Sequence, residues 1–140
     1  MPTRYEASTT IDASPQRVWA LLTDASRYPE WNTGVLALDG EIAPGSRISL
    51  TAATSPKRAF RLKVAELDAP RRMVWSSGMP LGLFKGARTF TVEPNGDGAE
   101  FSTVEEFTGP LAGMICKKMP DLTDSFRRWC VDLKAAAEAG

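Results

Sequence analysis

The sequence contains no histidine, and this absence excludes several kinds of chemistry. With only two cysteines and no Cys-x-x-Cys motif, the ligand sets of zinc and of most transition-metal sites cannot be assembled. Histidine is also the commonest general base, so the serine and threonine hydroxyls lack their usual activating partner. No glycine-rich phosphate loop is present either. We therefore expect no metal, no bound cofactor and no activated nucleophile.

The sequence also lacks long apolar runs and a disulfide-compatible cysteine pair. No run approaches the ~20 apolar residues that span a bilayer, and the N-terminal "MPTRYEAS" has no signal-peptide core. On one helix, Cys116 and Cys130 would lie ~21 Å apart, whereas a disulfide requires Cα atoms within about 7 Å. We expect a soluble, cytoplasmic protein without an integral membrane segment.

The charges give no sign of a polyanionic partner. The 17 basic and 17 acidic residues cancel, and no block of like charge stands out. This pattern argues against binding to nucleic acid or to an anionic membrane. The 140 residues are enough for one domain with a sizeable core, so we expect a single ligand-binding domain over residues 1–140. The oligomeric state stays open.

The hydrophobic pattern predicts a strand, one or two short helices, about six strands and a long helix. Residues 3–12 alternate in the manner of a strand. Ser14 and Pro15 then suit the N-cap and first position of a helix, and "ASRYPEW" suits one further helical turn. Further strands are expected around 34–39, 46–53, 59–67, 72–78, 84–94 and 99–109.

The last thirty residues change from a strand period to a helix period. Apolar residues recur at steps of four and three from Leu111 to Ala137, which predicts an amphipathic helix of ~28 residues. Pro120 interrupts this helix without shifting the apolar stripe, so we expect a kink. A run of strands with helices segregated from it indicates an α+β domain with an antiparallel sheet.

Three stretches carry a resemblance to a known superfamily: "IDASPQRVWALLTDASRYPEWN", "LDAPRRMVWSSG" and the helix after "FTGPLAG". Their order resembles the START-related, pollen-allergen-like SRPBCC superfamily, which includes polyketide cyclase/dehydrase-like and lipid-transport-like bacterial proteins. The resemblance implies a helix-grip fold, in which a curved antiparallel sheet of six to seven strands wraps around a long C-terminal helix. It also implies a deep apolar cavity for a hydrophobic small molecule.

The turn "NGDG" sets the register of the last hairpin. If Asn95 lies opposite Gly98, then Arg88 lies opposite Glu105, and side-chain alternation places both on the inner face. The two charges can satisfy each other within the apolar wall. Alternatively, Arg88 binds a ligand carbonyl or carboxylate while Glu105 orients it. An arginine neighbour would lower the pKa of Glu105, which argues against a role as a base.

Other inward residues complete the candidate site, although each also suits ordinary core packing. The loop Gly78–Gly86 is either tucked on the core or a lid at the cavity mouth, and the stretch "DASRYPEWN" is interpreted chiefly as scaffold. The candidate ligand-binding residues are Trp31, Leu62, Trp75, Ser77, Phe84, Arg88, Phe90, Thr103, Glu105, Phe107, Met114 and Phe126.

Three functions are compatible with these residues. The favoured one is a binding module for a lipid, polyketide or aromatic metabolite, because few polar groups accompany the expected apolar cavity. The second is a polyketide cyclase, aromatase or dehydratase in which Arg88 polarises a carbonyl and Glu105 moves a proton. The third is an interaction protein resembling chaperone cofactors, which would require an exposed apolar patch outside the cavity.

Overall fold

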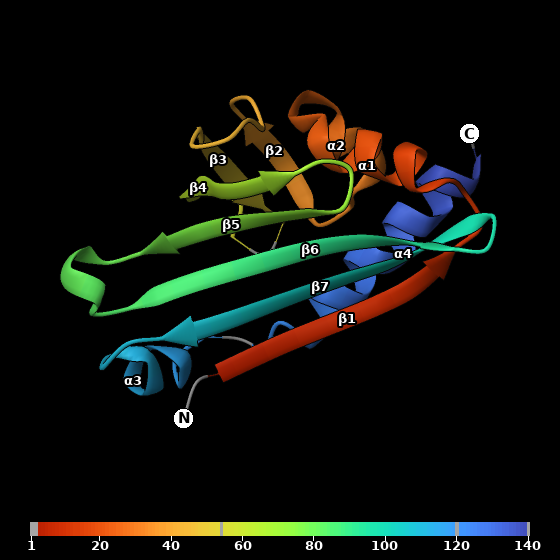
Figure 1. Cartoon of the computed structure of the whole chain (residues 1–140). Coiled ribbons are helices and arrows are strands. Elements are labelled where there is room, and N and C mark those ends of the chain that lie inside the picture. Colours follow the sequence, from red (N-terminus) through yellow and green to blue (C-terminus); the bar gives the residue numbers. More distant parts are fainter. Residues whose placement is uncertain (1–2, 54, 120, 140) are drawn as a thin grey trace.

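The computed structural model describes residues 3–53, 55–119 and 121–139, and this part of the chain forms one antiparallel sheet with short and long helices. The strand order is β1-β7-β6-β5-β4-β3-β2, and Figure 1 shows how strongly the sheet curls. The strands are β1 (Thr3–Ile11), β2 (Val35–Asp39), β3 (Arg47–Ala52), β4 (Ala59–Asp68), β5 (Arg72–Gly78), β6 (Lys85–Asn95) and β7 (Gly98–Thr108). The helices are α1 (Pro15–Thr23), η1 (Ala25–Arg27), α2 (Tyr28–Trp31), η2 (Pro80–Gly82), α3 (Ala112–Cys116) and α4 (Thr123–Ala139), of which η1 and η2 are 3-10 turns.

The predicted start of the first helix is confirmed. The hydroxyl of Ser14 accepts a 3.2 Å hydrogen bond from the amide of Arg17, and Pro15 occupies the first helical position. Pro29 lies in the first turn of α2, where its missing N–H leaves no helical hydrogen bond unmade. The expected helical turn after α1 is therefore two consecutive short turns, η1 and α2.

The C-terminal region differs from the expected single long helix. Instead of one helix of ~28 residues, the structure has the five-residue α3 and the 17-residue α4. The carboxylate of Asp121 accepts a 2.9 Å hydrogen bond from the amide of Thr123 and so provides a new start for α4. The expected kink at Pro120 lies outside the described residues. The predicted apolar stripe is confirmed on α4 by its buried Phe126, Trp129, Leu133 and Ala137.

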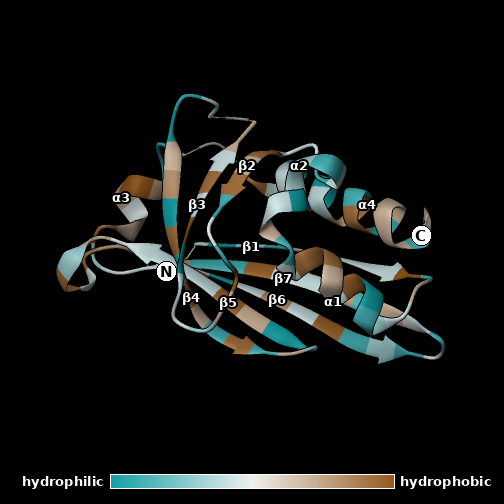
Figure 2. Ribbon diagram, turned by 90° about the horizontal axis from the view of Figure 1, so that it is seen from above, coloured by the Kyte–Doolittle hydropathy of each residue, from teal (hydrophilic) through white to brown (hydrophobic). Residues whose placement is uncertain are grey.

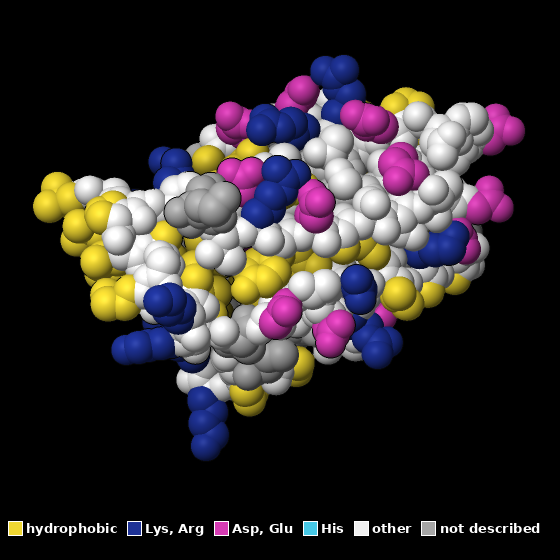
Figure 3. All heavy atoms as spheres, turned by 90° about the horizontal axis from the view of Figure 1, so that it is seen from below, with side chains coloured by type: hydrophobic (Ala, Val, Ile, Leu, Met, Phe, Trp, Pro, Cys, Tyr) yellow, Lys and Arg dark blue, Asp and Glu magenta, His cyan; other side chains and the backbone are white. Residues whose placement is uncertain are grey.

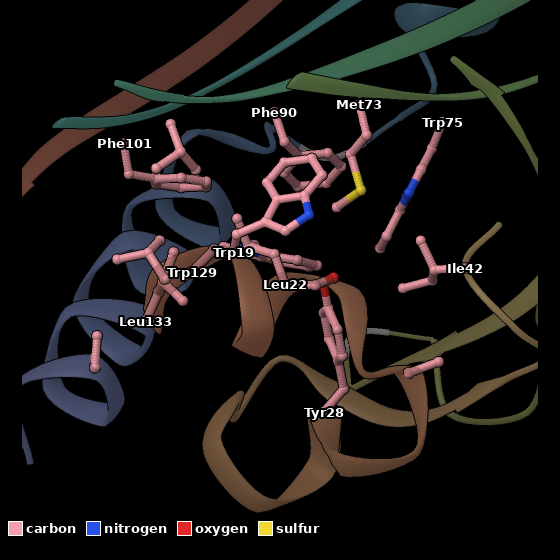
Figure 4. Packing of buried hydrophobic residues seen from close by; sticks show 14 of the residues in the cluster. Trp19, Leu22, Tyr28, Ile42, Met73, Trp75, Phe90, Phe101, Trp129 and Leu133 are labelled. Atoms are coloured by element: carbon pink, nitrogen blue, oxygen red, sulfur yellow. The ribbon is translucent and has the colours of Figure 1, made fainter. Parts of the chain in front are cut away.

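The core lies between the concave face of the sheet and the helices. Figure 2 shows α1, α2 and α4 grouped at one end of the sheet and α3 at the other. Near the first group, large side chains from strands and helices converge, among them Tyr28, Trp75, Phe90 and Trp129 (Figure 4). The Tyr28 hydroxyl donates a 2.5 Å hydrogen bond to the carbonyl of Leu22, so this fully buried ring carries no unpaired hydroxyl. A curled sheet gripping a C-terminal helix in this way is the helix-grip fold.

The pairing of β4 with β5 is irregular next to the candidate site. The β4–β5 register shifts between Val64 and Glu66, and such a bulge bends the strand and increases its twist. On the N-terminal side of the bulge, the β4–β5 ladder begins only at the pair of Lys63 with Ser76. Leu62 pairs only with β3, and Ser77 pairs only with β6. The two strands therefore separate at this end of the sheet.

Candidate functional site

The β6–β7 hairpin has the predicted register. Asn95 lies opposite Gly98, and further along the ladder Arg88 lies opposite Glu105. On the other side of β7, Glu105 lies opposite Tyr5 of β1. Phe90 lies two residues after Arg88 and Thr103 two residues before Glu105, so each shares a face with its neighbour. Both Phe90 and Thr103 are fully buried. The arginine and the glutamate therefore lie on the concave face, as expected from side-chain alternation.

Aromatic rings and one hydroxyl hold the guanidinium group of Arg88. Its central carbon lies 4.1 Å from the ring centroid of Phe126 and 4.2 Å from that of Trp129, distances typical of cation–π contacts. Its Nε atom donates a 2.8 Å hydrogen bond to the Thr103 hydroxyl. Its Nη2 atom is buried and has no hydrogen-bond partner among the described residues. One donor of the arginine is thus left unmatched.

The ion pair between Arg88 and Glu105 does not form within the described part of the chain: their charged groups are not within 4.0 Å of each other. The predicted opposition of Arg88 and Glu105 is confirmed. The guanidinium, however, lies against two rings of α4 and bonds to the hydroxyl of Thr103. Burial lowers the pKa of Arg88 to about 10, while the nearby Glu105 and Tyr28 partly oppose this shift. The arginine is still a cation at neutral pH.

Glu105 has an unusual electrostatic environment for a carboxylate. Burial raises its pKa above the ordinary value of 4.5, and the charge of Arg88 offsets only part of this effect. The expected lowering of this pKa by the arginine is confirmed, but desolvation outweighs it because the two charged groups are not in direct contact. A carboxyl with a raised pKa is better suited to exchange a proton near neutral pH.

A pocket of about 430 Å³ lies where β4 and β5 separate. Three of the predicted ligand-binding residues, Leu62, Ser77 and Phe84, line it. Ser77 is two residues from Trp75, which lies opposite Arg88, so the pocket is ~7 Å along the strand from the arginine row. The structure thus brings one part of the predicted site to the pocket and another to the neighbouring arginine.

The sequence interpretation missed the charged side of this pocket. Four cationic residues also line it: Arg47, Arg61, Lys63 and Lys85. The alternation of Arg61 and Lys63 with apolar neighbours in "RLKV" indicated an outward face, which is normally solvated and without function. No local pattern could show that the strands separate here, because the separation depends on pairing between segments distant in the sequence.

The remaining candidates have varied surroundings. Trp75 and Phe126 are buried in the core. Trp31 is half-buried and packs on Tyr28, with ring centroids 4.8 Å apart. Phe107 stacks on Phe84 with ring centroids 5.6 Å apart, and so connects the inner face to the pocket.

The loop between β5 and β6 is exposed rather than tucked on the core. Leu81 at its tip is 96% exposed and has a positive φ of 62°. The loop is anchored by the amide of Leu111, which donates a 3.0 Å hydrogen bond to the carbonyl of Leu83. Met114, on the nearby α3, is 56% exposed. Figure 3 shows hydrophobic side chains gathered at this end of the molecule, with Lys and Arg side chains beside them.

The described residues contain no group of three or more Cys, Asp or Glu side chains that could hold a metal ion. None of their helices is both long and apolar enough to cross a membrane. Cys116 and Cys130 are free thiols, and burial raises the pKa of Cys130 to about 11, so this thiol is a poor nucleophile at neutral pH.

Comparisons with known proteins agree with the fold. The family model described as "Polyketide cyclase / dehydrase and lipid transport" matches residues 2–138. A search of curated proteins found no match.

Three solved structures illustrate the similarity of the fold. A START superfamily protein from Mycobacterium smegmatis aligns with a TM-score of 0.72 and 14% identity, covering 97% of both chains. Truncated norcoclaurine synthase from Thalictrum flavum aligns with a TM-score of 0.72 and 14% identity, covering 97% of this chain and 93% of that one. The di-domain ARO/CYC protein StfQ of the steffimycin biosynthetic pathway aligns with a TM-score of 0.75 and 15% identity, covering 99% of this chain and 52% of that one.

Proposed function

Because the chain belongs to the polyketide cyclase/dehydrase and lipid transport family, we propose that it binds a hydrophobic small molecule in the pocket between β4 and β5. The pocket carries this proposal: its volume of about 430 Å³ falls within the range of ~300–1,000 Å³ typical of small-molecule sites. Leu62, Met79 and Phe84 offer the ligand an apolar surface there.

Arg88 supplies a polar anchor next to this surface. Its buried Nη2 atom lacks an acceptor within the described chain, and an unmatched buried donor costs about 1–3 kcal/mol. A carbonyl oxygen on a ligand that extends from the pocket along the inner face would satisfy it. The ligand is therefore expected to combine an apolar body with an oxygen acceptor.

An NMR titration with the neutral ketone 2-acetylnaphthalene tests this function. We expect the backbone amide signals of Leu62, Ser77 and Phe84 to shift, and Leu62→Glu to abolish saturable binding by placing a charge in the apolar wall. The matched control is Leu36→Glu, because Leu36 is 50% exposed on β2 and does not line the pocket. A titration that leaves the pocket signals unmoved would contradict the proposal, as would equal affinity in Leu62→Glu and the wild type.

A second candidate function, proton transfer in an aldol-type cyclisation, is favoured by the raised pKa of Glu105. In this reaction Arg88 hydrogen-bonds a substrate carbonyl oxygen, and Glu105 takes a proton from the adjacent carbon. The resulting carbanion adds to a second carbonyl carbon of the same molecule, and the new alkoxide takes the proton back from Glu105, which restores the carboxylate. The test is turnover of a poly-β-ketone thioester: Glu105→Gln should abolish cyclisation while retaining binding. Unchanged turnover in that variant would remove Glu105 from the mechanism.

A further inference from the structure

The pocket between β4 and β5 has a strongly cationic rim. Arg47 lies opposite Lys63 across β3–β4, and Lys63 lies opposite Ser76 across β4–β5. Arg61 is two residues before Lys63, so the two side chains lie on the same face of β4. Lys85 lies opposite Gly78 at the start of β6 and closes the rim from the other side. Four cations thus surround one opening.

These cations have no counter-charge of their own. Among the residues described, none of the four forms an ion pair within 4.0 Å, and none donates a side-chain hydrogen bond. No Asp or Glu in the described chain lines the pocket. Since the whole protein has a net charge of zero, the rim is a local surplus of positive charge. Cations gathered around a concave surface concentrate the positive potential there and attract anions.

The separation of the strands gives the pocket two kinds of wall. Arg61 and Lys63 project from one face of β4, whereas Leu62 between them projects from the other. Because β4 is not paired with β5 before Lys63, side chains of both faces reach the same pocket. Leu62 and Phe84 continue inward from the cationic rim, and Phe84 stacks on Phe107 of the inner face.

We propose that the pocket selects an anionic amphiphile, a small molecule with a carboxylate or phosphate group at the Arg61–Lys63 rim and an apolar body against Leu62 and Phe84. This inference rests on the proposed function and specifies its class of ligand. Guanidinium and ammonium groups are the usual partners of carboxylates and phosphates in proteins, and arginine binds either group through two parallel hydrogen bonds. The apolar wall distinguishes such a ligand from a free inorganic anion.

Titration calorimetry with four compounds tests the selection: octanoate, octyl phosphate, octan-1-ol and inorganic phosphate. We expect the wild type to bind octanoate and octyl phosphate at least about tenfold more tightly than octan-1-ol. The preference should weaken with added salt, because the rim is exposed. The double variant Arg61→Gln/Lys63→Gln should lose the preference and keep its affinity for octan-1-ol.

The matched control is Arg127→Gln/Arg128→Gln, which removes two exposed cations of α4 that do not line the pocket and should leave all four affinities unchanged. Binding of octan-1-ol without any preference for the two anions would overturn the selection but not the proposed function. Failure of every octyl compound to bind would overturn the selection, whereas the proposed function is overturned only by the failure of 2-acetylnaphthalene to bind. If inorganic phosphate binds as tightly as octyl phosphate, the apolar body adds nothing to the affinity, and the proposal of an amphiphilic ligand is wrong.

Discussion

The Nε atom of Arg88 donates a 2.8 Å hydrogen bond to the hydroxyl of Thr103, although the residue directly opposite Arg88 is Glu105. The guanidinium lies against Phe126 and Trp129, so the arginine is held by α4 and by a neutral hydroxyl. This arrangement leaves the carboxyl of Glu105 without a direct cationic partner among the described residues. Its protonation is therefore governed mainly by burial.

Replacing Thr103 by valine should destabilise the fold. The substitution keeps the shape of the side chain but removes the acceptor of the Arg88 Nε donor, which leaves a buried charged donor unmatched. We expect a loss of about 1–3 kcal/mol in the free energy of unfolding, measured by urea denaturation. Thr89→Val is the matched control on the outer face of β6, where a change within about 0.5 kcal/mol is expected. Equal losses of unfolding free energy in the two variants would show that the hydrogen bond between Thr103 and Arg88 does not stabilise the fold.

Replacing Glu105 by glutamine should change how stability depends on pH. The folded-state pKa of Glu105 is raised, so as pH increases above 4.5 the carboxyl ionises first in the unfolded chain. The folded state then binds more protons than the unfolded state, and the free energy of unfolding of the wild type falls. Glutamine does not titrate, so the stability advantage of the variant should grow from pH 4.5 upwards until the folded carboxyl has also ionised. Urea denaturation at a series of pH values measures this difference in the free energy of unfolding. A difference that shrinks as pH rises would mean that folding lowers the pKa of Glu105.

Replacing Arg88 by methionine should remove the preference for ligands that carry an oxygen acceptor. Methionine keeps an unbranched chain between the rings of Phe126 and Trp129, so the packing should survive the loss of charge. We expect the wild type to bind 2-acetylnaphthalene about tenfold more tightly than 2-ethylnaphthalene, and the variant to bind the two equally, as measured by calorimetry. Both compounds are neutral, so the cationic rim of the pocket does not affect the comparison. If the variant keeps the preference, a donor other than Arg88 must bind the ketone oxygen.

Replacing Tyr28 by phenylalanine should weaken the core close to α2. The Tyr28 hydroxyl donates to the carbonyl of Leu22 within a fully buried site, so its removal leaves that carbonyl without this donor. A loss of about 1 kcal/mol in the free energy of unfolding is expected from urea denaturation. Tyr5→Phe serves as the control, because the hydroxyl of the half-buried Tyr5 makes no hydrogen bond within the described chain. A loss of similar size in Tyr5→Phe would mean that the hydrogen bond is not the cause.

Local patterns in the sequence were enough to predict the strands, the first helix and the hairpin that carries the site, although not the division of the C-terminal region into α3 and α4. The turn "NGDG" determines its own register, because Asn and Gly accept the positive φ of a tight hairpin. Once Asn95 lies opposite Gly98, the opposition of Arg88 and Glu105 follows from counting along the two strands. The cap at Ser14 and the stripe of α4 depend equally on neighbours a few residues away.

The chemistry of the site was decided by contacts that counting cannot supply. Phe126 and Trp129 come from a helix some forty residues after Arg88, and their approach draws the guanidinium away from Glu105 and leaves burial to set the pKa of that carboxyl. The pocket likewise exists because β4 is not paired with β5 before Lys63. The sequence by itself determined which residues face one another along the hairpin, since strand geometry repeats every two residues. The tertiary structure alone decided which of those residues touch and where the cations gather, since both depend on how distant segments pack.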